Sequence, residues 1–122
     1  MKRKESSTNQ LNQTAISDKC NIAYSLGFIE GRWKPTILWL LLRDEPLRFS
    51  ALKRLIPDIS ERMLTAALKE LENDRLLQRI VYPEVPPKVE YLLTEQGKSL
   101  TPVLKELEKW GEHHKSLLRE KD

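Results

Sequence analysis

The sequence predicts one mainly α-helical domain that carries a small β-hairpin of two or three strands. Three observations lead to this fold class. Apolar residues recur at helical spacing through most of residues 21–73. Two runs rich in β-branched, aromatic and leucine residues, 77–82 and 89–93, then follow close together with prolines between them. A further helical pattern occupies the C-terminal part of the chain.

Composition restricts the class of protein. The chain has 122 residues, 39% of them hydrophobic and 32% charged, which is enough for one modest core. Lys and Arg number 21 against 18 Asp and Glu, and the basic excess lies in the first two-thirds of the sequence. No apolar run is long enough to span a membrane or to serve as a secretory signal. We therefore expect a cytoplasmic protein without a membrane partner.

Cysteine and histidine usage argues against a metal site. Cys20 is the only cysteine, so the chain has no intrachain disulfide and no cysteine-based zinc site. His113 and His114 are adjacent and cannot share one helix face. The sequence also lacks a Gly-rich phosphate loop and a base positioned to activate Cys20. We expect no metal, no cofactor and no enzymatic activity.

The N-terminal half is expected to form helices after a flexible arm. Residues 1–18 are polar and aperiodic and form the predicted arm, and 19–122 form the folded domain. A first helix is expected at 21–30, ended by Gly31. The second, 33–43, has almost no polar face and should occupy the centre of the core.

A short helix at 50–56 and a longer helix up to Asn73 are separated by a turn. Ser60 is a favourable N-cap for the longer helix, and Glu61 complements its dipole. The side expected to be buried consists of Met63, Leu64, Ala67, Leu68 and Leu71. The opposite side consists of Arg62, Thr65, Ala66, Lys69 and Asn73.

One long helix is expected after the hairpin. Thr94 should cap it, Pro102 should kink it, and Gly97 and Gly111 should loosen it. Its apolar stripe consists of Leu100, Val103, Leu104, Leu107, Trp110, His114, Leu117 and Leu118.

The order of these elements predicts a binding function. A short helix, a brief turn and a second helix form the helix-turn-helix arrangement, and a β-ribbon directly afterwards makes it a winged helix-turn-helix. In this geometry the second helix enters the major groove of DNA by its N-terminal end. We expect contacts to double-stranded DNA from Ser60, Arg62, Met63, Thr65, Ala66, Lys69, Arg48, Lys53 and Lys88.

The same segments resemble a known family. Gly31-Arg32-Trp33-Lys34, Ile59-Ser60-Glu61-Arg62-Met63-Leu64-Thr65 and Tyr82-Pro83-Glu84-Val85-Pro86-Pro87-Lys88 closely resemble the HxlR-type helix-turn-helix regulators, a branch of the MarR-like winged helices. The resemblance implies a bacterial transcription regulator, usually a repressor, that binds palindromic operator DNA as a homodimer. Ala66 departs from the family pattern, in which a long polar residue is usual. One base contact is therefore missing or replaced by apolar contact with a thymine methyl group.

Dimerisation is expected through the first and last helices. The apolar stripe of the last helix is too long for a domain of this size to cover, and bare apolar patches usually mark an interface. The resemblance adds the first helix to this interface. The expected interface residues are Ile22, Leu26, Leu107, Trp110, Leu117 and Leu118.

Cys20 has two interpretations. It is either a partly buried packing residue or a sensor of oxidants and electrophiles. The N-terminal end of a helix and the neighbouring Lys19 both favour the reactive thiolate. Some members of the resembled family sense through a cysteine at this position. With one cysteine per chain, the chemistry is limited to an adduct, a mixed disulfide or a bridge between subunits.

Two further alternatives stay open. The fold also fits a protein–protein interaction module that does not bind DNA. The arm residues Lys2, Arg3 and Lys4 form either a solubilising tail or an arm that enters a DNA groove. The sequence identifies no small-molecule effector and no operator.

Overall fold

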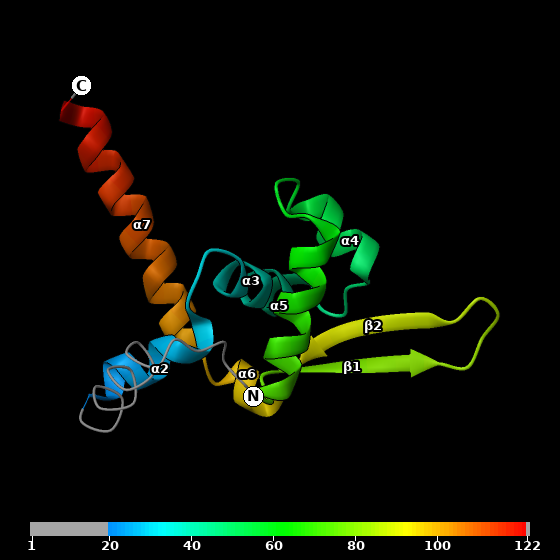
Figure 1. Cartoon of the computed structure of the whole chain (residues 1–122). Coiled ribbons are helices and arrows are strands. Elements are labelled where there is room, and N and C mark those ends of the chain that lie inside the picture. Colours follow the sequence, from blue (N-terminus) through cyan, green and yellow to red (C-terminus); the bar gives the residue numbers. More distant parts are fainter. Residues whose placement is uncertain (1–19, 122) are drawn as a thin grey trace.

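The computed structural model describes residues 20–121 of the chain, and the predicted arm at 1–18 lies outside them. Helices precede and follow one antiparallel hairpin (Figure 1). The mainly α-helical winged fold predicted from the sequence is confirmed. In chain order the elements are α2 (Asn21–Ile29), α3 (Trp33–Asp44), α4 (Phe49–Leu55), α5 (Glu61–Asn73), β1 (Leu77–Tyr82), β2 (Lys88–Leu93), α6 (Glu95–Lys98) and α7 (Thr101–Lys121).

Helix α3 lies at the centre of the core, as expected. Its side chains Ile37, Leu38 and Leu41 are completely buried. Helix α5 packs against α3 and contributes Leu64, Ala67, Leu68 and Leu71. Burial of these aliphatic side chains holds α5 in place and leaves its opposite side free.

Met63 is the exception on α5. It was expected on the buried side, but its side chain is 46% exposed. The buried positions 64, 67, 68 and 71 follow an i, i+3, i+4, i+7 row, and Met63 lies at the edge of that row. Its neighbour Leu64 points into the core instead and is completely buried.

The sheet has two strands, not three. Strands β1 and β2 pair with Leu77 opposite Leu93 and Tyr82 opposite Lys88. Leu47 adds one antiparallel bridge, because its backbone exchanges hydrogen bonds of 3.0 and 2.8 Å with Tyr91. The sheet therefore has two strands and a one-residue third contact, which ties the segment before α4 to the base of the hairpin.

The C-terminal region corrects the expectation of one kinked helix. Thr94 caps only the short α6, its side chain accepting a hydrogen bond from the N–H of Gly97. The chain then turns, and Pro102 lies in the first turn of α7, where a proline has no N–H bond to break. Gly97 does not loosen a helix. It is buried, and a Cβ there would lie 2.0 Å from the carbonyl oxygen of Leu76.

Helices α2 and α7 lie on the side of the molecule away from the hairpin (Figure 1). Of the α2 residues only Ile29 is buried. Within α7, Leu104 alone belongs to the core. The two helices thus project apolar surface that the described chain does not cover.

Candidate nucleic-acid interface

The exposed side of α5 gathers most of the predicted contact residues. Arg62, Thr65, Ala66 and Lys69 are all exposed and follow an i, i+3, i+4, i+7 row, so they share one helix face. Met63 joins them at the edge of this face. The structure therefore brings together five residues named from the sequence, from the first turn of α5 to its middle.

The start of α5 is fixed by its cap. Ser60 is exposed, and its Oγ accepts a hydrogen bond of 3.0 Å from the N–H of Met63. This bond uses only one lone pair of the hydroxyl, so the O–H of Ser60 can still donate to a phosphate, as predicted. Arg32, between α2 and α3, also contacts the turn before α5 by an ion pair of 3.6 Å with Asp58.

The predicted cations of the α4 segment occupy different surroundings. Arg48 is exposed at the N-cap position of α4, and Lys53 is half-buried. Neither lines the groove beside α5 that is described below, although Phe49 does.

Lys88, the predicted contact of the wing, is engaged within the hairpin. Its Nζ lies 3.6 Å from a carboxylate oxygen of Glu90 and 4.9 Å from the centre of the Tyr82 ring. The Tyr82 hydroxyl donates a hydrogen bond of 2.9 Å to the other oxygen of Glu90. This hydrogen bond, with burial and the charges of Glu90 and Glu84 as smaller causes, raises the pKa of Tyr82 above its usual value. Glu90 thus offsets part of the charge that Lys88 would offer to a phosphate.

A groove of about 650 Å³ runs between α5 and the base of the hairpin. It includes Thr65 and Lys69, and it adds two cations that the sequence analysis did not single out, Arg75 and Arg79. The full lining consists of Phe49, Thr65, Leu68, Lys69, Glu72, Asn73, Arg75, Arg79 and Tyr91.

Arg75 has an uncommon backbone conformation. Its φ is 63°, in the left-handed region, and it is the only non-glycine with positive φ among the described residues. It follows the C-cap of α5, where the N–H groups of Arg75 and Leu76 bond back to Glu72 and Leu71, the arrangement that usually ends in glycine. An arginine where glycine is expected was the sequence signal that could have drawn attention to this position.

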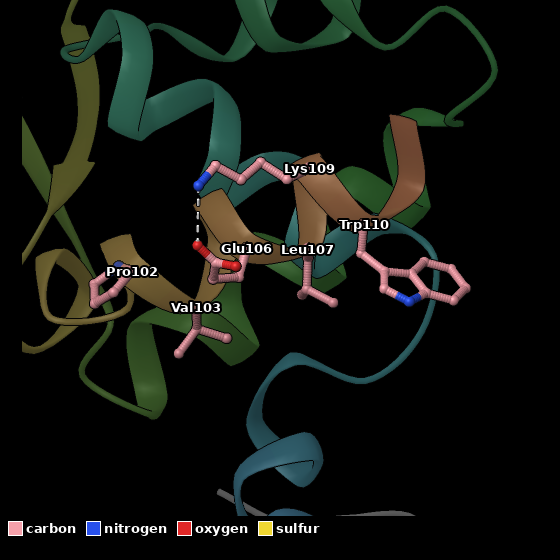
Figure 2. Close-up of a pocket in the computed structure, with 6 residues that line it drawn as sticks. All are labelled: Pro102, Val103, Glu106, Leu107, Lys109 and Trp110. Atoms are coloured by element: carbon pink, nitrogen blue, oxygen red, sulfur yellow. Dashed lines mark hydrogen bonds and ion pairs between the residues drawn. The ribbon is translucent and has the colours of Figure 1, made fainter. Parts of the chain in front are cut away.

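The predicted interface residues are all exposed. Ile22 is 72% exposed on α2, and Trp110 is 64% exposed on α7. Figure 2 shows Val103, Leu107 and Trp110 projecting from the same side of α7, where they line an open, mostly apolar groove of about 750 Å³. Further along, Trp110 stacks on His114, with ring centres 4.8 Å apart. Leu26, Leu117 and Leu118 are likewise about half exposed.

Cys20 is exposed and stands at the N-cap position of α2. Of its two interpretations, the one as a partly buried packing residue does not fit this exposure, because only the last turn of α2 reaches the core. Its backbone carbonyl accepts the N–H of Tyr24 at 3.1 Å. The thiol is therefore accessible to small reagents.

Two further properties concern residues 20–121. No helix there is both long and apolar enough to cross a membrane. In the same residues, no group of three or more His, Cys, Asp or Glu side chains is arranged to hold a metal ion.

Several known proteins resemble this chain in sequence and in structure. The sequence profile of a family described as HxlR-like helix-turn-helix matches residues 28–118. An uncharacterized HTH-type transcriptional regulator of Methanothermobacter thermautotrophicus is 50% identical over 97 residues, 80% of this chain and 73% of the relative. The redox regulator HypR in its reduced form has a TM-score of 0.77 at 39% identity, covering 82% of this chain and 98% of HypR. Diamide-treated YodB from B. subtilis has a TM-score of 0.65 at 37% identity, covering 77% and 92%.

Proposed function

We propose, because the chain belongs to the HxlR-like helix-turn-helix family, that it represses transcription by binding palindromic operator DNA as a homodimer. The relatives of the chain are transcriptional regulators and not enzymes. The observation that carries this proposal is the exposed row of Arg62, Thr65 and Lys69 on a capped helix. That helix follows α4 and a turn, as a DNA-reading helix does.

The roles of the contact residues differ. Arg62 is long enough to form two hydrogen bonds with a guanine, and Thr65 is short enough to require close approach to a base edge or phosphate. Lys69 and Lys88 act mainly as positive charges on phosphates. Ala66 offers a methyl group to thymine. Sequence preference thus resides in the first two turns of α5, and Lys69 adds affinity.

The experiment selects bound fragments from random DNA with the purified full chain and then measures affinity for the best sequence. Arg62→Ala should weaken binding by about 1–3 kcal/mol and relax the preference at one base pair in each half-site. Lys69→Ala should weaken all sequences alike. Lys105→Ala, which removes an exposed lysine of α7, is the matched control and should bind as wild type.

The same experiment distinguishes DNA binding from the alternative function, a protein–protein interaction module. Wild-type protein that selects no DNA sequence and binds no duplex at low salt would contradict the proposal. The fold would then serve as a protein–protein interaction module. Repression is tested by joining the selected operator to a reporter promoter, where expression of the protein should lower the signal.

The homodimer is supported by the exposed apolar faces of α2 and α7. Two recognition helices joined by a two-fold axis read half-sites about 34–36 Å apart, or multiples of that distance. Selected sequences should therefore be inverted repeats with that spacing.

A response to oxidants or electrophiles is a second candidate function. It is supported by the exposed thiol of Cys20 at the start of α2, one of the two helices in the proposed interface. The names of two structural neighbours also favour it, because HypR is called a redox regulator and YodB was studied after diamide treatment.

A further inference from the structure

The groove between α5 and the hairpin carries an excess of positive charge. Lys69, Arg75 and Arg79 line it, and Glu72 is the only carboxylate among its lining residues. The three cations come from different places: Lys69 from the exposed face of α5, Arg75 from the turn after it, and Arg79 from β1. Three chain segments thus direct positive charge to one polar groove.

These cations have no acidic partner within the described residues. Lys34, Lys88, Lys98 and Lys109 each form an ion pair with a glutamate. None of the ion pairs found in residues 20–121 involves Lys69, Arg75 or Arg79. Their charge therefore stays available to an external anion.

Arg75 keeps its side chain at a conformational cost. In the left-handed region the Cβ of a residue crowds the following carbonyl oxygen, and glycine avoids this strain because it has no Cβ. The backbone bonds that end α5 would form equally well with glycine or asparagine at this position. The arginine side chain is not needed for the turn.

We propose that Arg75 and Arg79, together with Lys69, hold the sugar-phosphate backbone of DNA between α5 and the wing. This inference rests on the proposed function. When the start of α5 lies in the major groove, a phosphate strand borders that groove beside the helix. The hairpin leaves the opposite end of α5 (Figure 1), so this strand can pass between the two.

The chemistry that recognises this ligand is the phosphodiester anion. Arginine presents a planar fork of donors that matches two phosphate oxygens, and lysine adds a point charge. Contacts of this kind fix the position of the protein on the duplex and do not select bases. Arg75 and Arg79 should therefore raise affinity for all sequences alike.

The test measures DNA affinity by fluorescence anisotropy over a series of salt concentrations, with the selected operator and the full chain. The variants are Arg79→Gln and Arg75→Asn, and Lys105→Gln is the control on α7. Each lost phosphate contact should make the slope of log K against log salt less negative by about 0.9. A variant loses one such contact in each subunit of the dimer. Base preference should not change.

A second experiment locates the phosphate that Arg79 contacts. Uncharged methylphosphonates are introduced one at a time beside each half-site. One position should weaken wild-type binding and have little further effect on Arg79→Gln, because the same contact is already absent. Thermal unfolding of Arg75→Asn should occur at or above the wild-type temperature, since asparagine accepts this backbone conformation more readily. Loss of affinity without loss of stability is a result that a purely structural role would not give.

Wild-type salt slopes in both variants, with wild-type operator binding intact, would overturn the inference and leave the proposed function standing. Absence of DNA binding in the wild type would overturn both. Binding of inorganic phosphate to the free protein, with unchanged salt slopes in the variants, would assign the groove to a small anion and also overturn the inference.

Discussion

Lys34, at the start of α3, forms an ion pair with Glu70 near the end of α5, and it is the only charged side chain buried among the described residues. Its side chain is 10% exposed, whereas that of Glu70 is 45% exposed. The pair joins the central helix of the core to the helix that we propose reads DNA. Removal of Glu70 would therefore leave a buried charge, whereas removal of Lys34 would leave a half-exposed one.

We expect Glu70→Ala to lower the free energy of unfolding more than Lys34→Met. Without Glu70 the buried ammonium group has no counter-charge, whereas without Lys34 the half-exposed carboxylate is solvated and methionine fills the apolar space. The loss for Glu70→Ala should be about 1–3 kcal/mol, between the values for exposed and buried pairs. Urea unfolding measures both, and a larger loss in Lys34→Met would contradict this account.

Gly97 and Gly111 should respond in opposite directions to alanine. A Cβ at Gly97 would collide with the Leu76 carbonyl oxygen at 2.0 Å, and backbone cannot move aside cheaply, so Gly97→Ala should destabilise by about 3 kcal/mol or more. A Cβ at Gly111 meets nothing within 4 Å and lies in the interior of α7. Gly111→Ala should raise the stability by up to about 1 kcal/mol. Thermal unfolding of the two variants compares them, and equal effects would contradict the packing at Gly97.

Much of the fold could be predicted because local signals agree with the tertiary structure. The buried α3, the Ser60 cap and the two strands each follow from apolar pattern, capping chemistry or β-propensity. The break between α6 and α7 was missed because Thr94 is a good cap for either a short or a long helix. The close approach of Gly97 to Leu76 depends on residues far apart in the chain and has no local signature.

Some residues of the candidate site could also be predicted from local sequence, whereas others depend on tertiary packing. Arg62, Thr65 and Lys69 could be placed on one face from helical spacing alone, and the structure agrees. Arg75 and Arg79 could not, because the groove they line arises only when the hairpin packs beside α5. Likewise, the contact of Lys88 with Tyr82 depends on strand register, which the sequence left undetermined.

The Tyr82–Glu90 hydrogen bond predicts a pH dependence of the wing. Because this bond raises the pKa of Tyr82 in the folded state, its contribution to stability is present below the ordinary tyrosine pKa of about 10 and is lost as the pH rises through the folded value. Glu90→Gln should return the pKa toward the ordinary value. A titration of the Tyr82 ring carbon by NMR measures it in both proteins. Identical titration curves would show that Glu90 does not cause the shift.

Trp110→Glu should convert the proposed homodimer into a monomer. The substitution puts a charge into the exposed apolar groove of α7, where burial against a second copy would cost it its hydration. Light scattering should give the monomer mass, and affinity for the palindrome should fall because two half-sites are no longer bound together. Lys105→Ala, which lowers the net charge by the same one unit at an exposed position elsewhere on α7, should remain dimeric. A monomeric wild type, or a dimeric Trp110→Glu, would remove α7 from the interface.

Cys20 should make operator binding sensitive to thiol reagents. Diamide oxidises two thiols to a disulfide and is itself reduced to the hydrazine. With one cysteine per chain, the product is a Cys20–Cys20 bridge between subunits or, with an added small thiol, a mixed disulfide. A quinone instead takes up the thiolate at a ring carbon and becomes a substituted hydroquinone. Each product enlarges or crosslinks α2 at its exposed N-terminal end.

Because α2 belongs to the proposed interface, such a change should alter the separation of the two α5 helices, and a palindrome is read through that separation. Operator affinity of the treated wild type should fall about five-fold or more, within the usual range of coupling between sites. Cys20→Ser should bind normally before and after treatment, and mass spectrometry should find the adduct only in the wild type. An equal loss in both proteins, or an adduct on Cys20 with unchanged affinity, would leave Cys20 without a sensing role.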